Sequence, residues 1–170
     1  MPITYLVRPK YDGLTVDVCY VNGRLISANT ADRDISEYAK CISDIPNYLS
    51  GNLVPSEMVV RGEIVVLKNR YNPLIGPSSI LDMMYSIGAN TKPDDRFGYM
   101  CHTIVEMSRD VSTPSTEDDS ISFLAGLGFR QLDYVSIIDN LNCTYDCAYQ
   151  IMSEKHNLEY RISGIVVKPN

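Results

Sequence analysis

The sequence predicts an α+β fold in which antiparallel β-sheets are flanked by helices, and two observations predict it. Residues 14–21 alternate apolar and polar side chains with the period of a half-buried strand, and Asn22-Gly23 then turns the chain into a returning strand at residues 24–28. Helical segments are interspersed among further strand segments, as in α+β proteins. A length of 170 residues suits one domain spanning residues 1–170.

The other strands are expected where apolar residues alternate or cluster. They cover residues 3–7, residues 58–68, the stretch around residues 97–101, and residues 162–168. Gly62 lies inside the second of these strands, which indicates a bulge or a place of close ligand approach.

Four helices are expected between these strands. Asp34 would cap a short helix that ends at Cys41, and Ser78 or Ser79 would cap one that ends near Gly88. The remaining two helices are expected at residues 120–127 and 144–154. The stretch 109–120, rich in Ser, Thr, Asp and Pro, is expected to be a surface loop.

The bulk composition favours an intracellular globular protein. Hydrophobic residues make up 45% and charged residues 21% of the chain, no apolar run approaches a membrane span, and the first residues lack the features of a signal peptide. We therefore expect a cytoplasmic location. The net charge of −6 is unlike that of a free-standing nucleic-acid clamp, which is usually basic.

The five cysteines predict no metal site. Their number is odd and their spacing is scattered; Cys143 and Cys147 lie four residues apart, but His102 and His156 do not complete a zinc pattern. Reduced, partly buried thiols are expected.

The segment with the clearest chemical potential runs from residue 8 to residue 14 and holds Lys10, Asp12 and Gly13. Lys10 stands between the short strand at residues 3–7 and the long hairpin. Gly13 permits a tight turn or close approach of a ligand. Lys-x-Asp-Gly alone is a weak pattern that a surface turn explains equally well.

Three ordered blocks strengthen the interpretation. Residues 10–30 resemble NAD-dependent DNA ligases without a gap, from the lysine through the Asn22-Gly23 turn to Thr30. Residues 60–64 are similar to the Arg-Gly-Glu strand of that family, and residues 158–168 are similar to its closing strand with a second essential lysine, here Lys168.

The resemblance implies the covalent nucleotidyltransferase fold of ligase adenylation domains, which is related to the ATP-grasp fold. It also implies a reaction. The lysine attacks the α-phosphate of NAD, nicotinamide mononucleotide leaves, and AMP stays on the lysine through a P–N bond. AMP then passes to a DNA 5′-phosphate, and the 3′-hydroxyl seals the nick. Mg²⁺ is expected as the cofactor because hard phosphate oxygens favour it.

The resemblance also implies a role for each candidate residue. Lys10 would be the nucleophile, with a nearby cation and partial burial favouring its neutral amine. Lys168 would be the second cation, and Asp12 would orient Lys10 or a phosphate-bound metal. The nucleotide-binding residues implied by the resemblance are Arg8, Tyr11, Gly13, Arg33, Glu63, His102, Lys155 and Gly164. Taken singly, each of these residues also fits an ordinary turn or exposed strand face.

Several positions depart from the family pattern. Arg8 replaces a glutamate near the adenine, His102 replaces the stacking aromatic residue, and Lys155 replaces an arginine. Ala31 stands where an arginine is expected, and Arg33 would have to reach the same group from two residues later. A further arginine-containing segment is largely lost at residues 71–84. These changes remove charge from the phosphate and DNA side.

The chain resembles only part of a ligase. The parts without a counterpart are the N-terminal nicotinamide-recognition domain, the OB-fold, and the zinc, helix-hairpin-helix and BRCT regions. A defined fragment and a split subunit completed by a second ligase polypeptide both fit, and the high Tyr, Asn and Ile usage leans to a phage or virus, hence a host cytoplasm. Nicked DNA would then be held mainly by other domains or that subunit. Two other functions stay open: a non-catalytic subunit that binds a partner chain or nucleotide, and a relative that uses ATP or GTP.

Overall fold

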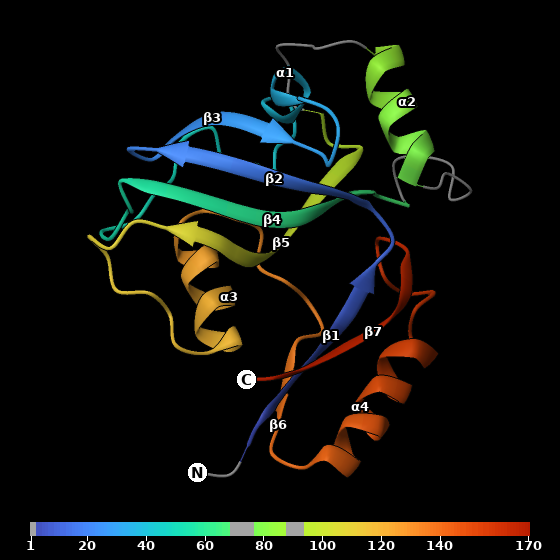
Figure 1. Cartoon of the computed structure of the whole chain (residues 1–170). Helices are drawn as coiled ribbons and strands as arrows, with labels where there is room; N and C mark the ends of the chain where they lie inside the picture. Colours follow the sequence, from blue (N-terminus) through green and yellow to red (C-terminus); the bar gives the residue numbers. More distant parts are fainter. Residues whose placement is uncertain (1–2, 69–76, 88–93) are drawn as a thin grey trace.

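The computed structural model describes residues 3–68, 77–87 and 94–170 (Figure 1). Along the chain, its elements are β1 (Tyr5–Tyr11), β2 (Leu14–Val21), β3 (Arg24–Asn29), α1 (Ser36–Ala39), β4 (Glu57–Val66), α2 (Pro77–Ile87), β5 (Phe97–Met107), α3 (Glu117–Gly126), β6 (Ser136–Ile138), α4 (Leu141–Ser153) and β7 (Ile162–Pro169).

These strands form two antiparallel sheets. The large sheet has the order β3-β2-β4-β5, and the small sheet has the order β6-β1-β7. Figure 1 shows the large sheet above the small one, with α1 and α2 beside the large sheet and α4 beside β1 and β7. The α+β prediction with antiparallel sheets and flanking helices is confirmed.

The β2–β3 hairpin forms for the reason that the sequence indicates. Val16, Val18 and Tyr20 are buried on one face of β2, while the residues between them are more exposed. Asn22 and Gly23 both have positive φ, 48° and 73°, as a two-residue hairpin turn requires. This hairpin supplies two of the four strands of the large sheet.

Gly62 is where β4 and β5 come closest. A Cβ at this position would lie 2.6 Å from the Met100 carbonyl oxygen and 2.8 Å from the Cys101 Cα, and the strand register shifts between Arg61 and Gly62. Of the two alternatives expected from the sequence, the bulge is present; the group that approaches Gly62 closely is a neighbouring strand and not a ligand. The glycine therefore sets how tightly β4 and β5 pack.

Two hydrophobic clusters hold the layers together. The larger one lies between the large sheet and the helices α1 and α2, which bury Ala39, Ile80 and Met84. The smaller cluster joins the small sheet to the ends of β4 and β5. Helix α3 contributes Leu124 to the larger cluster and Ile121 to the smaller one, so it bridges the two.

Two predicted helices begin elsewhere than the sequence indicates. The first helix is only α1, capped at Ile35; Asp34 lies just before it and accepts a hydrogen bond from the Ser36 N–H at 2.8 Å. Helix α2 begins at Pro77, so Ser78 and Ser79 lie in its first turn and do not cap it. Proline fits a first turn because the amides there have no intrahelical partner.

The last two helices also begin earlier than predicted. Thr116 accepts a hydrogen bond from the Asp119 N–H at 3.0 Å and caps α3, which shortens the predicted loop at residues 109–120. Asn140 caps α4 in the same way. In both helices, the capping side chain sets the residue at which the helix begins.

The small sheet departs furthest from the prediction. Strand β1 runs on to Tyr11 instead of ending at Val7, and β6 was not predicted. None of the five cysteines, all of which lie in the described residues, forms a disulfide. Over residues 3–68, 77–87 and 94–170, no helix has the length and apolar character of a transmembrane span.

Replacing Gly62 by Ala is expected to lower the free energy of unfolding by about 2–4 kcal/mol, because the new methyl group would overlap backbone atoms that cannot move away. Gly126→Ala is the matched control, since a Cβ there meets nothing within 4 Å. In a helix, that change should be neutral or stabilise by up to about 1 kcal/mol. Urea unfolding of both variants measures the difference, and equal stabilities would contradict this account of the β4–β5 contact.

Candidate active site

Lys10 is the next-to-last residue of β1, whereas the sequence analysis placed it after a strand. Among the described strands, β6 pairs only with Tyr5–Val7, so the second half of β1 pairs with β7 alone. A proline such as Pro9 is tolerated where one side of a strand has no partner. The Lys10 side chain is exposed and makes no hydrogen bond or ion pair with any described residue.

Arg8, Lys10 and Lys168 share one face of the small sheet. Lys10 stands opposite Gly164 on β7, and Leu6 stands opposite Lys168. Opposed residues of antiparallel strands point to the same face, as do alternate residues of one strand. Lys10 and Lys168 are thus about four strand positions apart, roughly 13 Å along the sheet, with Arg8 between them.

Arg8 is a buried cation at the centre of this face, with 6% of its surface exposed. It donates a hydrogen bond from Nη1 to the Pro9 carbonyl oxygen at 3.0 Å, and its guanidinium carbon lies 5.6 Å from the Tyr11 ring centroid. Burial lowers the pKa of Arg8, and the nearby Tyr11, Glu117 and Glu63 act in the opposite direction. Arginine keeps its proton even so, which places a positive charge between the two sheets.

Glu63 faces this region from β4, with 17% of its side chain exposed. Both of its carboxylate oxygens lie 3.0 Å from the donating hydroxyl of Thr15, the cross-strand partner on β2. Arg61, two residues before Glu63 on β4, pairs with Asp17 on β2. The Arg61 Nε and Nη2 atoms donate to the Asp17 carboxylate at 2.7 and 2.8 Å. Thr15 therefore fixes the orientation of the Glu63 carboxylate.

His102 on β5 lies beside Glu63, with Nε2 3.8 Å from the carboxylate oxygen Oε1. That distance exceeds a hydrogen bond. Burial lowers the pKa of His102, and the positive charges of Arg8 and Lys168 add to this, while Glu63 raises it. The ring is thus neutral at neutral pH and lies nearly parallel to Tyr11, with 6.4 Å between centroids and 21° between planes.

Lys168 reaches a carboxylate that sequence reasoning did not single out. Its Nζ lies 3.5 Å from Oε2 of Glu117, in the first turn of α3. The same helix end is tied to the chain after β7 by a hydrogen bond from the Asp118 N–H to Oδ1 of Asn170, at 2.9 Å. Neither Glu117 nor Thr15 has a sequence pattern that marks it; the pairing of distant segments brings each to the site.

Asp12 and Gly13 form the corner between β1 and β2. The Asp12 N–H donates to the Arg161 carbonyl oxygen at 3.0 Å, and the carboxylate oxygen Oδ2 lies 3.4 Å from Arg161 Nε. A Cβ at Gly13 would lie 2.5 Å from the Ile64 carbonyl oxygen. The absence of a side chain at Gly13 thus lets this corner press against β4, next to Glu63.

Arg33 and Lys155 lie outside the cluster. Arg33 is 3.8 Å from Asp32 and lies over the Tyr85 ring of α2, at 5.7 Å. Lys155 follows α4 and lines a separate pocket with Lys68, His156, Arg161 and Ile162. Gly164, opposite Lys10, has open space where a Cβ would be.

Two buried hydroxyls adjoin the cluster. Within the described part of the chain, the hydroxyls of Tyr11 and Tyr160 are buried without a hydrogen-bond partner. The two rings meet edge to face, with 5.3 Å between centroids. Burial raises the pKa of Tyr160 to about 12, so this hydroxyl stays protonated.

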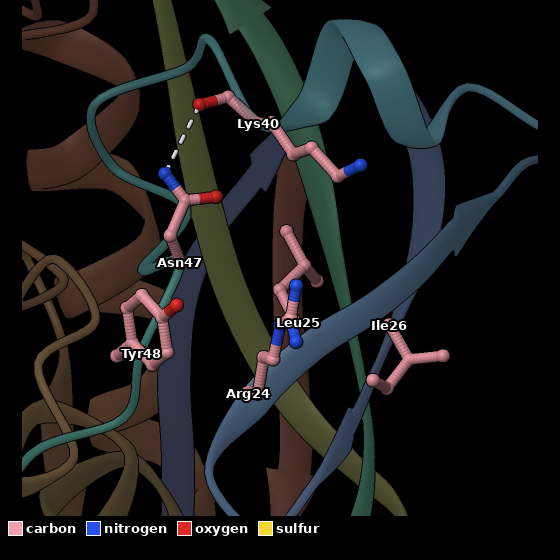
Figure 2. Close-up of a pocket in the computed structure, with 6 residues that line it drawn as sticks. All are labelled: Arg24, Leu25, Ile26, Lys40, Asn47 and Tyr48. Carbon is pink, nitrogen blue, oxygen red and sulfur yellow. Dashed lines mark hydrogen bonds between the residues drawn. The ribbon is translucent and has the colours of Figure 1, made fainter.

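A pocket of about 570 Å³ lies elsewhere on the protein (Figure 2). It shares no lining residue with the cluster of Arg8, Glu63, His102 and Lys168. It lies between β3 and the segment after α1, where the Asn47 side chain donates to the Lys40 carbonyl oxygen at 3.2 Å. Over residues 3–68, 77–87 and 94–170, no group of three or more His, Cys, Asp or Glu residues is placed to hold a metal ion.

Comparison with known proteins identifies the chain's relatives. Residues 1–77 match the model of the NAD-dependent DNA ligase adenylation domain. A DNA ligase of Chelativorans sp. is 28% identical over 99% of this chain, and a DNA ligase of Francisella tularensis subsp. novicida is 27% identical over 96%. The chain spans about a quarter of these relatives, 26% and 27% of their lengths.

A solved structure supports the fold. The chain superposes on a mycobacterial DNA ligase D complexed with ATP and MES with a TM-score of 0.55. The match covers 98% of this chain and 48% of that one at 16% sequence identity, so it bears on the fold alone. The family model over residues 1–77, the relatives over nearly the whole chain and the fold of the solved structure together show that this chain is similar to NAD-dependent DNA ligase adenylation domains.

Proposed function

We propose that this chain is the adenylation module of a DNA ligase. The Lys10 amine attacks the α-phosphate of NAD, a P–N bond forms, and the bond from that phosphorus to the bridging oxygen breaks. Nicotinamide mononucleotide leaves with the bond's electron pair, and the amine loses a proton. The AMP held on Lys10 then passes to a DNA 5′-phosphate, where displacement by a 3′-hydroxyl seals the nick.

The observation that carries this proposal is the arrangement around the small sheet. A lysine open to solvent shares a sheet face with two further cations, and a half-buried carboxylate and a neutral aromatic ring lie across from that face. Cations beside a reacting phosphate stabilise the negative charge that develops on it. Such a set suits transfer of a phosphate-linked group to an amine.

Within that arrangement, the individual roles follow from residue chemistry. Lys168, held by Glu117, would stabilise the pentavalent phosphorus. Glu63, held by Thr15, would accept hydrogen bonds from ribose hydroxyls. His102 and Tyr11 offer aromatic surfaces for the base, with Arg8 as a buried donor beside them. Gly164 would leave room for the nucleotide, whereas Gly13 would hold the β1–β2 corner against β4 beside Glu63.

Asp12, Arg33 and Lys155 would act at the edge of the site. Asp12 faces Arg161, and would turn toward Lys10 or a metal only if that pair opened. Mg²⁺ is the expected metal, yet the described carboxylates near the site do not form a ligand group. It would have to be bound mainly through substrate phosphates, and no step above depends on it.

DNA contacts would come mostly from outside residues 1–170. The chain carries a net charge of −6 and matches about a quarter of the length of its relatives. Neutralising a DNA backbone takes several basic residues on one surface. We therefore propose that other domains, or a partner ligase polypeptide, provide most of the grip on nicked DNA.

A non-catalytic role is the second candidate. The Lys10 side chain makes no hydrogen bond or ion pair with the described residues, and Arg33 and Lys155 lie away from the cluster. A subunit that kept the fold to bind a partner chain or a nucleotide would show these features.

Radiolabelled NAD separates these candidates. We expect the wild-type chain, alone or with its partner, to retain label from the adenylate on a denaturing gel. Lys10→Ala should remove the label by at least about 1,000-fold, because no other group can form the bond. Lys10→Arg is the matched control, since it keeps the charge without the reactive amine.

Three outcomes of this experiment are informative. Label from NAD that Lys10→Arg also loses supports the enzyme. Label from ATP alone would move the chain to the ATP-using relatives. No label under any condition leaves the non-catalytic subunit.

Glu63→Gln is expected to raise the KM for NAD by about tenfold, since the loss of one charged hydrogen bond typically costs 1.5–3 kcal/mol. Thr15→Val should raise it less, because the carboxylate stays but loses its orientation. Steady-state labelling at varied NAD measures both, with unfolding curves as a check on folding. An unchanged KM in both variants would remove Glu63 from the nucleotide site.

A further inference from the structure

A second cluster of cations lies beyond the corner that follows Lys10. A pocket of about 280 Å³ is lined by Lys68, Lys155, His156, Arg161 and Ile162. These residues come from the segment just after β4, the segment after α4 and the approach to β7 together with its first residue, Ile162. The pocket shares no residue with the cluster of Arg8, Glu63, His102 and Lys168.

This pocket carries more positive charge than the overall composition of the chain would lead one to expect. Three of the chain's 15 Lys and Arg residues and one of its two His residues line a single small pocket, in a protein with a net charge of −6. Asp12 is a carboxylate that faces it, through its ion pair with Arg161. The residues that line the pocket include three cations and no carboxylate.

Contacts that stabilise the fold explain the positions of only some of these basic residues. Lys68 donates a hydrogen bond from Nζ to the Lys155 carbonyl oxygen at 3.1 Å, which satisfies a backbone acceptor beyond the end of α4. The side chains of Lys155 and His156 are exposed and have no hydrogen bond or ion pair with a described residue. The Lys155 ammonium and the His156 imidazole are therefore available to bind a ligand.

We propose that this pocket binds a phosphate monoester, the group carried both by a DNA 5′ end and by a mononucleotide. Clustered Lys, Arg and His donors match the charge and the several acceptor oxygens of this group. Asp12 connects the pocket to the site, because it faces Arg161 and stands two residues after Lys10. The identity of the natural ligand rests on the proposed function, whereas phosphate binding itself does not.

Titration of the ¹⁵N-labelled chain with inorganic phosphate tests the pocket directly. Saturable shifts are expected in the backbone amide signals of Lys68, Lys155, His156 and Arg161. The double variant Lys155→Gln/His156→Gln removes both available donors without touching the Lys68 hydrogen bond, and should weaken binding by about tenfold. The matched control is Arg24→Gln/Lys40→Gln, which removes two cations from the pocket of Figure 2 and should change nothing.

Either of two results would overturn the proposal: no saturable shift at the four positions, or equal binding by the double variant. Lys10→Ala separates this proposal from the enzymatic one, since it should bind phosphate as the wild type does. Phosphate binding without adenylation would support the pocket and contradict the proposed function. Adenylation without phosphate binding would support the proposed function and contradict the pocket.

Competition assigns the source of the phosphate. Nicotinamide mononucleotide is compared with nicked duplexes that carry a 5′-phosphate or a 5′-hydroxyl at the nick. Displacement of inorganic phosphate by the mononucleotide assigns the pocket to the leaving group. Displacement by the 5′-phosphorylated duplex, but not by the hydroxyl duplex, assigns it to the DNA end. If none of the three competes, the proposal fails.

Discussion

The pairing of β1 with β7 is the constraint on which the rest of the site depends. These strands lie about 155 residues apart in the sequence, yet their register sets which side chains share a face. Lys10 falls opposite Gly164, and Leu6 falls opposite Lys168, so the three cations of this face are spaced by strand geometry. A shift by one residue would send alternate side chains to the opposite face.

The large sheet supplies the opposing wall. At Gly13 and Gly62, backbone meets backbone without room for a side chain, and both glycines lie beside Glu63. Thr15 then orients the carboxylate from the neighbouring strand. Polar groups are thus held between two layers by backbone packing, and α3 joins the layers through one apolar residue in each hydrophobic cluster.

Local patterns in the sequence were enough for the hairpin at residues 14–28, for Gly62 and for the last strand, since each depends on alternation or a turn within a few residues. Strand β6 has three residues and no readable period, and Pro9 obscured the continuation of β1. The site was predictable in its residue types but not in its contacts. The Glu63–Thr15 and Lys168–Glu117 pairs join residues 48 and 51 positions apart, and no local pattern encodes them.

The position of β7 also has a consequence for biosynthesis. The small sheet needs residues 162–169 as the partner of β1, so a nascent chain still lacking them can assemble the hairpin and the large sheet but not the surface that carries Lys10. Distant strand pairing of this kind is slow because a long loop must close first. During translation, Lys10 therefore acquires its neighbours on β7 last, after the larger layer is already in place.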